Sequence, residues 1–134
     1  MEEKLELIQI WMDLAGEKLE VARELLDLSR FDDTVSKAYY VMFYSAKAAL
    51  LAIDVDLRRH SGVVSQFGQR FVKTGYADER YSRILARAMQ AREASDYDPR
   101  TRASRQDAEQ AIADAEAFLE KAREILKRML GKDT

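Results

Sequence analysis

The sequence has no cysteine, one histidine, one proline and only five glycines. Without cysteine there is no disulfide, no thiolate nucleophile and no thiolate metal ligand. A single histidine cannot supply a multi-histidine metal site, so we expect neither a metal nor another cofactor. We also expect no cleavable N-terminal signal, because the first residues are acidic and amphipathic, and no apolar run is long enough to span a bilayer. We therefore expect no membrane partner and a cytoplasmic location.

The residues that are present favour a helical protein. Hydrophobic residues make up 47% of the 134 residues and charged residues 34%, which is typical of a folded chain, and the length fits a single domain over residues 1–134. Few helix breakers and many Ala, Leu, Glu, Lys and Arg residues favour helices. No segment shows the alternation of a β-strand. The composition and pattern therefore predict an all-α fold.

Apolar residues recur every three or four positions in five segments, as in amphipathic helices. We expect a helix to end before Pro99, and we expect Ser61 and Ser104 to be N-caps, the latter in a capping box with Asp107. The predicted architecture is an antiparallel up-and-down bundle of four long helices plus one shorter helix, the third in chain order. The expected helices cover residues 4–28, 34–53, 62–73, 78–95 and 104–130.

Charge is unevenly distributed along the chain. The formal net charge is −2, but residues 58–105 contain eleven Lys or Arg against five Asp or Glu, which gives +6 for this segment and −8 for the rest. A basic segment in an acidic protein is typical of a local anion-binding surface. The alternative is that the basic segment pairs with the acidic terminal helices of the same or another subunit.

The start of the expected third helix has the parts of an anion site. A helix start presents free N–H groups and the positive end of the helix dipole. Arg59, His60 and Ser61 would add hydrogen-bond donors beside it, so a phosphate could bind there. The alternative is that the arginine is solvated and His60 packs against a tyrosine.

A second candidate site lies in AREASDYDP, residues 91–99. The guanidinium of Arg92 can hold a phosphate through two hydrogen bonds, and Tyr97 follows after four intervening residues. The alternative is that Arg92 pairs with Asp96, one turn on, and that Tyr97 fixes the following loop to the bundle. Lys37 and Tyr40 are further ligand-binding candidates, since tyrosines can stack on bases, although aromatic residues at helical spacing are also typical of a core.

Three blocks of the sequence resemble the small HEPN-domain proteins of prokaryotes. They are SKAYYVMFYSAKAALLA (36–52), RHSGVVSQFGQRFVKTG (59–75) and ARxxSDYDP (91–99), in the order in which the family has them. The resemblance covers most of the chain. It implies an up-and-down bundle of four or five helices, usually a homodimer, that accompanies a minimal nucleotidyltransferase in a toxin–antitoxin-like two-component system.

Many HEPN domains are metal-independent endoribonucleases whose signature is an arginine followed, after four to six residues, by a histidine. Carried over to this sequence, the arginine is Arg92, and Tyr97 stands where a histidine is expected; no histidine follows Arg92. Tyrosine, with an ordinary pKa near ~10, is a poor proton acceptor near neutral pH. The resemblance therefore implies a nucleotide- or RNA-binding protein. The alternatives are an endoribonuclease that uses Arg92 with Tyr97 or His60, and a purely structural dimerisation module.

Overall fold

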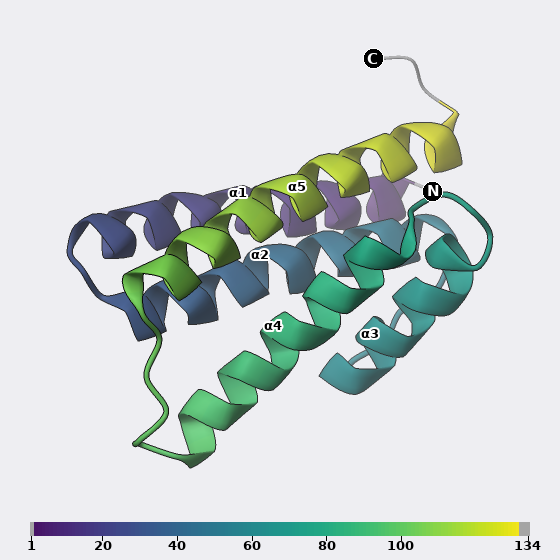
Figure 1. Cartoon of the computed structure of the whole chain (residues 1–134). Helices are drawn as coiled ribbons and strands as arrows, with labels where there is room; N and C mark the ends of the chain where they lie inside the picture. Colours follow the sequence, from purple (N-terminus) through teal and green to yellow (C-terminus); the bar gives the residue numbers. More distant parts are fainter. Residues whose placement is uncertain (1, 132–134) are drawn as a thin grey trace.

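The computed structural model of the chain describes residues 2–131. These residues form five α-helices and a π-helical turn, and no β-strand. The four long helices and one shorter helix confirm the predicted all-α bundle, and their arrangement is shown in Figure 1. The elements are α1 (Glu2–Asp27), α2 (Phe31–Ala52), α3 (His60–Phe67), the π-helical turn (Gly68–Val72), α4 (Glu79–Tyr97) and α5 (Arg105–Leu130).

Helix α2 occupies the centre of the bundle. It packs against α1, α3, α4 and α5, so every other α-helix has it as a neighbour. Tyr39, Met42 and Leu50 are almost completely buried on it, together with six of its alanines and valines. A helix that is apolar over most of its surface can contact neighbours on several sides. This central position makes α2 the surface on which residues from α3 and α4 meet.

Three phenylalanines fix the short third helix to the bundle. Phe67 at the end of α3, Phe71 in the π-helical turn and Phe118 in α5 are buried, with Phe67 centred 5.4 Å from Phe71 and 4.9 Å from Phe118. A Cβ atom on Gly68 would lie 2.9 Å from Oγ of Ser82 in α4, so the absence of a side chain lets the π-helical turn lie close to α4. The single helix predicted over residues 62–73 is therefore an α-helix that starts earlier and ends in a π-helical turn.

Of the two predicted helix caps, the one at Ser104 is confirmed and the one at Ser61 is wrong. The capping box at the start of α5 is confirmed, since Oγ of Ser104 accepts from the backbone N–H of Asp107 at 3.0 Å and the Asp107 carboxylate accepts from the Ser104 N–H at 2.9 Å. The prediction that Ser61 caps α3 is wrong. Helix α3 already begins at His60, and its N-cap residue, Arg59, makes no side-chain capping bond. Contacts between His60 and α2, described below, favour this earlier start over the capping preference of serine.

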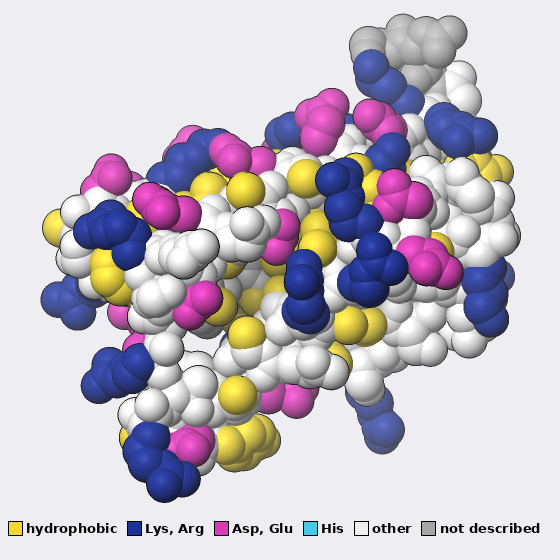
Figure 2. Space-filling model, viewed as in Figure 1, with side chains coloured by type: hydrophobic (Ala, Val, Ile, Leu, Met, Phe, Trp, Pro, Cys, Tyr) yellow, Lys and Arg dark blue, Asp and Glu magenta, His cyan; other side chains and the backbone are white. Residues whose placement is uncertain are grey.

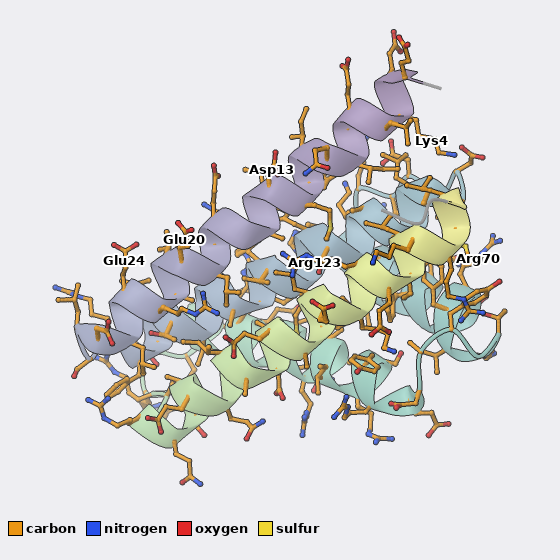
Figure 3. All side chains as sticks on the ribbon, turned by 90° about the horizontal axis from the view of Figure 1, so that it is seen from above. Lys4, Asp13, Glu20, Glu24, Arg70 and Arg123 are labelled. Carbon is orange, nitrogen blue, oxygen red and sulfur yellow. The ribbon has the colours of Figure 1, made fainter. Side chains whose placement is uncertain are left out.

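Acidic side chains of α1 are directed to solvent. Asp13, Glu20 and Glu24 point away from the bundle along the outer side of this helix (Figure 3). Solvated carboxylates on a terminal helix explain part of the negative charge outside residues 58–105. No helix within residues 2–131 is long and apolar enough to cross a membrane.

Basic residues of segment 58–105 pair in two ways. Arg83 pairs with Glu79 at 3.5 Å inside the segment, whereas Arg87 and Arg102 pair outside it, with Asp114 of α5 at 3.9 Å and Asp32 of α2 at 3.2 Å. Figure 2 shows the resulting mixture of Lys or Arg and Asp or Glu over the α4–α5 surface. Of these pairs only Arg87–Asp114 involves a terminal helix, so pairing with the acidic terminal helices accounts for a small part of the basic segment. Arg92 is considered separately below.

Candidate functional site

His60 is held against one face of α2. Its ring lies parallel to the ring of Phe43, with centroids 4.0 Å apart and planes 5° apart. Its Nδ1 shares a hydrogen bond with the hydroxyl of Tyr39, and Tyr40 meets the imidazole edge-on at a centroid distance of 6.1 Å. Because these three aromatic residues lie within four positions of one helix, a single turn of α2 supplies the contacts that position the histidine.

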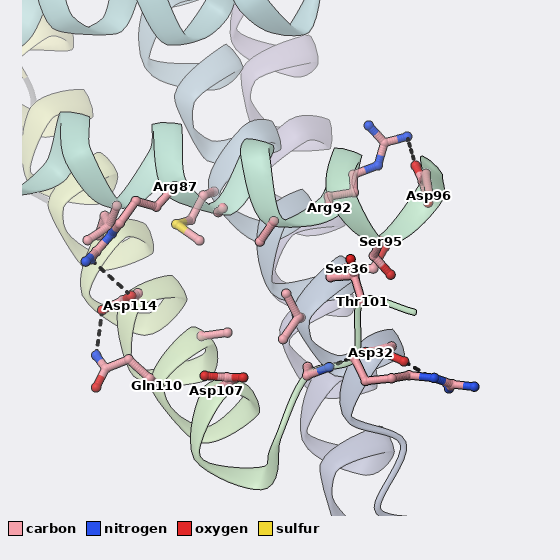
Figure 4. Close-up of a pocket in the computed structure, with 18 residues that line it drawn as sticks. Asp32, Ser36, Arg87, Arg92, Ser95, Asp96, Thr101, Asp107, Gln110 and Asp114 are labelled. Atoms are coloured by element: carbon pink, nitrogen blue, oxygen red, sulfur yellow. Dashed lines mark hydrogen bonds and ion pairs between the residues drawn. The ribbon is translucent and has the colours of Figure 1, made fainter. Parts of the chain in front are cut away.

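Arg92 approaches the same tyrosines from α4. Its Cζ is 5.3 Å from the ring centroid of Tyr40 and 5.7 Å from that of Tyr39, within the range of a cation–π interaction. The expected pair with Asp96 is confirmed at 3.6 Å, and Figure 4 shows Arg92 extending toward it. We refer to the five residues that meet here as the His60 cluster: Tyr39, Tyr40, Phe43, His60 and Arg92.

Burial and charge keep the imidazole neutral. Burial lowers the pKa of His60 below its ordinary value of 6.5, and the positive charges of Arg92 and Lys47 lower it further, whereas Glu93 acts in the opposite direction. A cation nearby disfavours a second positive charge on the ring. His60 is therefore mainly neutral at neutral pH, with one nitrogen protonated and the other free to accept a hydrogen bond.

Tyr39 can satisfy either neutral form of the histidine. Burial raises the pKa of the Tyr39 phenol, although Arg92 lowers it in part, so the hydroxyl stays protonated at neutral pH. This hydroxyl can donate to Nδ1, which places the imidazole proton on Nε2, or it can accept from Nδ1–H, which leaves Nε2 free as an acceptor. The same contact thus permits His60 to present either a donor or an acceptor at Nε2.

Lys47 adds a second cation beside the His60 cluster. Its Nζ is 4.6 Å from the ring centroid of Trp11 and 5.9 Å from that of Phe43. Together with the guanidinium of Arg92, this ammonium group makes the surroundings of His60 positive. Guanidinium, ammonium and imidazole N–H groups are the donors that bind phosphate oxygens. The arrangement is therefore chemically suited to an anionic ligand.

The structure brings together three of the residues predicted from the sequence. Tyr40, His60 and Arg92 come from α2, α3 and α4 and meet in the His60 cluster. The alternative expectation that His60 packs against a tyrosine is also confirmed, because Tyr39 is its hydrogen-bond partner. The position of His60 thus satisfies both expectations: the ring packs against α2, and it lies in the same cluster as Arg92.

The other predicted residues lie around this cluster or apart from it. Lys37 is half-buried and precedes Tyr40 by three residues on α2, while Arg59 and Ser61 are exposed on either side of His60 in the chain. Tyr97, the last residue of α4, is 86% exposed. The expectation that Tyr97 fixes the following loop to the bundle is therefore wrong.

Sequence reasoning missed Tyr39, Phe43 and Lys47 as neighbours of the histidine. Tyr39 and Phe43 are four residues apart, and Lys47 follows after four more, so all three share one side of α2. This spacing was a signal for a shared surface, but aromatic residues at helical spacing are typical of a core. Only the three-dimensional path of the chain from α2 to α3 shows that His60 packs against this side of α2.

Metal-binding geometry is not found in the described part of the chain. Within residues 2–131, no group of three or more His, Cys, Asp or Glu side chains is arranged to hold a metal ion. The His60 cluster offers an imidazole, a guanidinium and the half-buried ring of Tyr40, whereas Tyr39 is fully buried.

Comparison with known proteins places this bundle in a family. The family model described as the HEPN domain matches residues 8–125. "Putative toxin MJ0605" of Methanocaldococcus jannaschii is 36% identical over 125 residues, which cover 93% of this chain and 92% of that protein. "UPF0332 protein glr0978" of Gloeobacter violaceus is 40% identical over 116 residues (86% and 92%), and a "UPF0332 protein" of Thermotoga maritima is 35% identical over 131 residues (96% and 99%). The chain therefore belongs to the HEPN domain family.

Proposed function

We propose that this chain is a toxin-like HEPN protein that binds RNA at the His60 cluster. One observation carries the proposal: His60 of α3 and Arg92 of α4 contact the rings of the same two tyrosines of α2. An imidazole N–H and a guanidinium that pack on the same two tyrosines can donate to one phosphate. Membership of the HEPN family and the names of two relatives, both "Putative toxin", support a toxin-like role.

The contacts of Arg92 permit it to engage a ligand. Its ion pair with Asp96 is partly exposed, with 27% of the Arg92 side chain and 57% of the Asp96 side chain accessible. An exposed pair of this kind contributes little to stability, about 0–1 kcal/mol, so exchange of Asp96 for a phosphate costs little. Half-buried Tyr40 lies directly beside the guanidinium and can contact a nucleobase or ribose next to that phosphate.

A second function, metal-independent RNA cleavage, is favoured by the state of His60. With Nδ1–H donating to Tyr39, the free Nε2 of neutral His60 can take the proton of a ribose 2′-hydroxyl as the oxygen attacks the adjacent phosphorus. The imidazolium so formed can return that proton to the 5′-oxygen that leaves, and Arg92 can stabilise the additional negative charge on the phosphate. In this scheme His60 takes the place of the histidine that the sequence lacks after Arg92.

The proposed partners of this chain follow from its resemblance to the small HEPN-domain proteins. We infer that the chain acts as a homodimer and that a minimal nucleotidyltransferase accompanies it. Inspection of the neighbouring genes tests this directly, because a small nucleotidyltransferase gene there would support the two-component system. Co-purification of the two proteins would establish the complex.

Titration of labelled single-stranded RNA at a low and a higher salt concentration tests RNA binding. Affinity should fall as salt rises, because phosphate contacts release counterions. Arg92→Ala should weaken binding by roughly tenfold or more, the scale of a lost charged hydrogen bond. Arg83→Ala is the matched control, since Arg83 lies on the same helix and also pairs with an acid one turn away, Glu79.

The outcomes separate the candidate functions. Failure of the unmodified protein to bind RNA at low salt contradicts the proposal, and so does an equal effect of Arg92→Ala and Arg83→Ala; a purely structural module would give either result. Incubation of RNA with the protein in the presence of a chelator tests cleavage. If RNA stays intact with the unmodified protein, both alone and with its partner, the second function is wrong, and RNA binding is decided by the titration alone.

A further inference from the structure

Helix α1 carries a second apolar stripe beside the one that it buries. The buried stripe, which includes Ile8 and Ala15, packs on α2. The second stripe repeats at intervals of four and three residues, and its members are half-buried or exposed: Leu7, Trp11, Leu14, Lys18, Val21 and Leu25. Its four aliphatic residues do not belong to the hydrophobic core that residues 2–131 form. Apolar surface residues at this spacing are typical of a helix that packs against another helix.

This second stripe faces away from α5. Helix α1 packs on α2 and, less extensively, on α5, which runs beside it (Figure 3). Leu5, Gln9 and Met12 of α1 line the groove between α1 and α5. Nine residues, about two and a half helical turns, separate Leu5 from Leu14, so these two side chains point to opposite sides of α1. The second stripe therefore lies on the side of α1 that α5 leaves open.

Helix α2 continues the same surface. Between residues 37 and 52 of α2, every residue is buried except for a half-buried stripe at intervals of three and four residues: Lys37, Tyr40, Tyr44, Lys47 and Leu51. The two stripes meet at Trp11. Its ring stacks on that of Tyr44 with centroids 5.3 Å apart, and its centroid lies 4.6 Å from Nζ of Lys47. We call the residues of the two stripes the α1–α2 face.

The charge of the α1–α2 face is positive. Its charged residues are Lys18, Lys37 and Lys47, and all three are half-buried. Within residues 2–131 none of these lysines forms an ion pair with a carboxylate, whereas Lys4 and Lys121 do. An ammonium group among apolar side chains is well placed to bind a carboxylate of a partner. The face thus combines an apolar surface with three cations that the described chain does not neutralise.

The dimensions of the α1–α2 face fit one further helix. Helices α1 and α2 are joined by a short turn and run side by side (Figure 1). A third helix can therefore lie along both stripes at once, as in a helical bundle. The α1 stripe from Leu7 to Leu25 extends over about 27 Å, so a helix of about 18 residues covers its length.

Charge and apolar surface together distinguish among the possible occupants of the α1–α2 face. A second copy bound by two-fold symmetry would place the three lysines of one chain against those of the other, with no carboxylate on either face. A nucleic acid could pair with the lysines and stack on the aromatic rings, but it would leave the aliphatic side chains of α1 without an apolar partner surface. An amphipathic helix with acidic flanks satisfies both requirements.

We propose that the α1–α2 face binds an acidic amphipathic helix of a partner protein. The apolar residues of that helix pack on the aliphatic residues of the α1 stripe, and its Asp or Glu residues pair with Lys18, Lys37 and Lys47. Burial of apolar surface supplies affinity, and the ion pairs select acidic over basic helices. Tyr40 belongs both to this face and to the His60 cluster, but the inference goes beyond RNA binding and does not depend on it.

Two synthetic peptides serve as probes of the α1–α2 face. The acidic peptide has about 18 residues, with Leu at the apolar positions of a helix, Glu beside them and Ala elsewhere. The basic peptide carries Lys in place of each Glu, so the two differ only in charge. Trp11 is the only tryptophan of the chain, and it lies where the two stripes meet. Its fluorescence therefore measures binding at this face, because neither peptide contains an aromatic residue.

Matched variants test the two parts of the face separately. Leu14→Glu disrupts the apolar stripe, and Lys18→Glu reverses one of its charges. The controls are Gln9→Glu and Lys127→Glu, which make the same changes in charge at exposed positions of the groove between α1 and α5. Thermal unfolding verifies that every variant is folded. Lys18→Glu retains the test if the substitution at Leu14 prevents folding.

We expect the acidic peptide to change the Trp11 emission and to bind roughly tenfold or more tightly than the basic peptide at low salt. Leu14→Glu and Lys18→Glu should each weaken its binding by a similar factor, whereas the two controls should change it by less than about twofold. The inference is overturned if neither peptide binds, if both bind equally, or if the variants and their controls behave alike.

Two further results would identify a different occupant and also overturn the inference. Loss of self-association in Leu14→Glu would make the α1–α2 face a contact between copies of this chain. A change in Trp11 emission with single-stranded RNA, and none with the acidic peptide, would assign the face to nucleic acid. The peptides contain no phosphate, so the outcome with them is independent of RNA binding at the His60 cluster.

Discussion

Tyr39 and His60 share a hydrogen bond across 21 positions of the sequence, between the middle of α2 and the first residue of α3. Helix α3 has only eight residues, so this bond and the parallel contact with Phe43 largely determine where the histidine lies. The same tyrosine also contacts Arg92 of α4. One buried phenol of the central helix therefore brings together the imidazole and the guanidinium on which the proposed function depends.

The pKa of His60 should respond to Arg92. We expect it to lie below 6.5 in the unmodified protein and to rise toward 6.5 in Arg92→Ala, because loss of a nearby positive charge makes protonation easier. NMR titration of the imidazole signals measures this without ambiguity, since the chain has one histidine. Arg83→Ala should leave the value unchanged. An unchanged His60 pKa in Arg92→Ala would show that the two residues are not electrostatic neighbours.

Stability should depend on pH through His60. Its pKa is lower in the folded chain than the ordinary 6.5 of the unfolded chain, so the unfolded chain binds more protons between those two values. The contribution of His60 to the free energy of unfolding should therefore be fully present above pH 6.5. It should decrease as the pH falls through 6.5 toward the pKa of the folded chain. Chemical denaturation between pH ~7.5 and ~5.5 measures this slope. His60→Gln should remove the part due to the histidine, and an identical slope in the variant would contradict the assignment.

The capping box at the start of α5 should contribute measurably to stability. Ser104→Ala removes the hydroxyl that accepts from the N–H of Asp107, so we expect the free energy of unfolding to fall by about 1 kcal/mol. Urea denaturation is the measurement. Ser65→Ala is the control, because Ser65 is exposed within α3 and should change stability by less than ~0.5 kcal/mol. Equal effects of the two substitutions would disagree with the observed cap.

Self-association should depend on anions. Leu7 and Ile10 of α1 are 37% and 53% exposed, so apolar surface remains outside the bundle. In the homodimer that we propose, two Arg92 side chains near one cleft would repel each other at low salt, and a phosphate or nucleotide bound between them would stabilise the dimer. Sedimentation equilibrium at low salt, with and without nucleotide, measures this shift. A monomer under both conditions at high micromolar concentration would be inconsistent with a shared cleft.

Helical periodicity was sufficient to predict the bundle, because each long helix buries a regular apolar stripe. The Ser104 cap was predictable as well, because a capping box depends on residue types only three positions apart. The start of α3 was predicted wrongly, since contacts of His60 with Tyr39 and Phe43 outweigh the preference of Ser61 for a cap. Local preferences are weak compared with tertiary contacts at such positions.

The candidate site was only partly predictable for the same reason. His60, Arg92 and Tyr40 were identified from residue type and from the family resemblance, but their meeting depends on how α3 and α4 pack on α2. A linear motif led to Tyr97, which the structure places at the exposed end of α4. The cavity of about 400 Å³ between α2, α4 and α5 had no signal in the sequence, because it results from how α4 separates from α5 in space.

A double-mutant cycle in RNA affinity tests most directly whether His60 and Arg92 hold one ligand together. Dissociation constants of single-stranded RNA are compared for the unmodified protein, His60→Ala, Arg92→Ala and the double variant at one low salt concentration. If both side chains donate to the same phosphate, the double variant should lose clearly less binding free energy than the sum of the two single losses, because either change already disrupts the shared contact. Losses that add fully, or single variants that bind like the unmodified protein, would contradict a common site for the two residues.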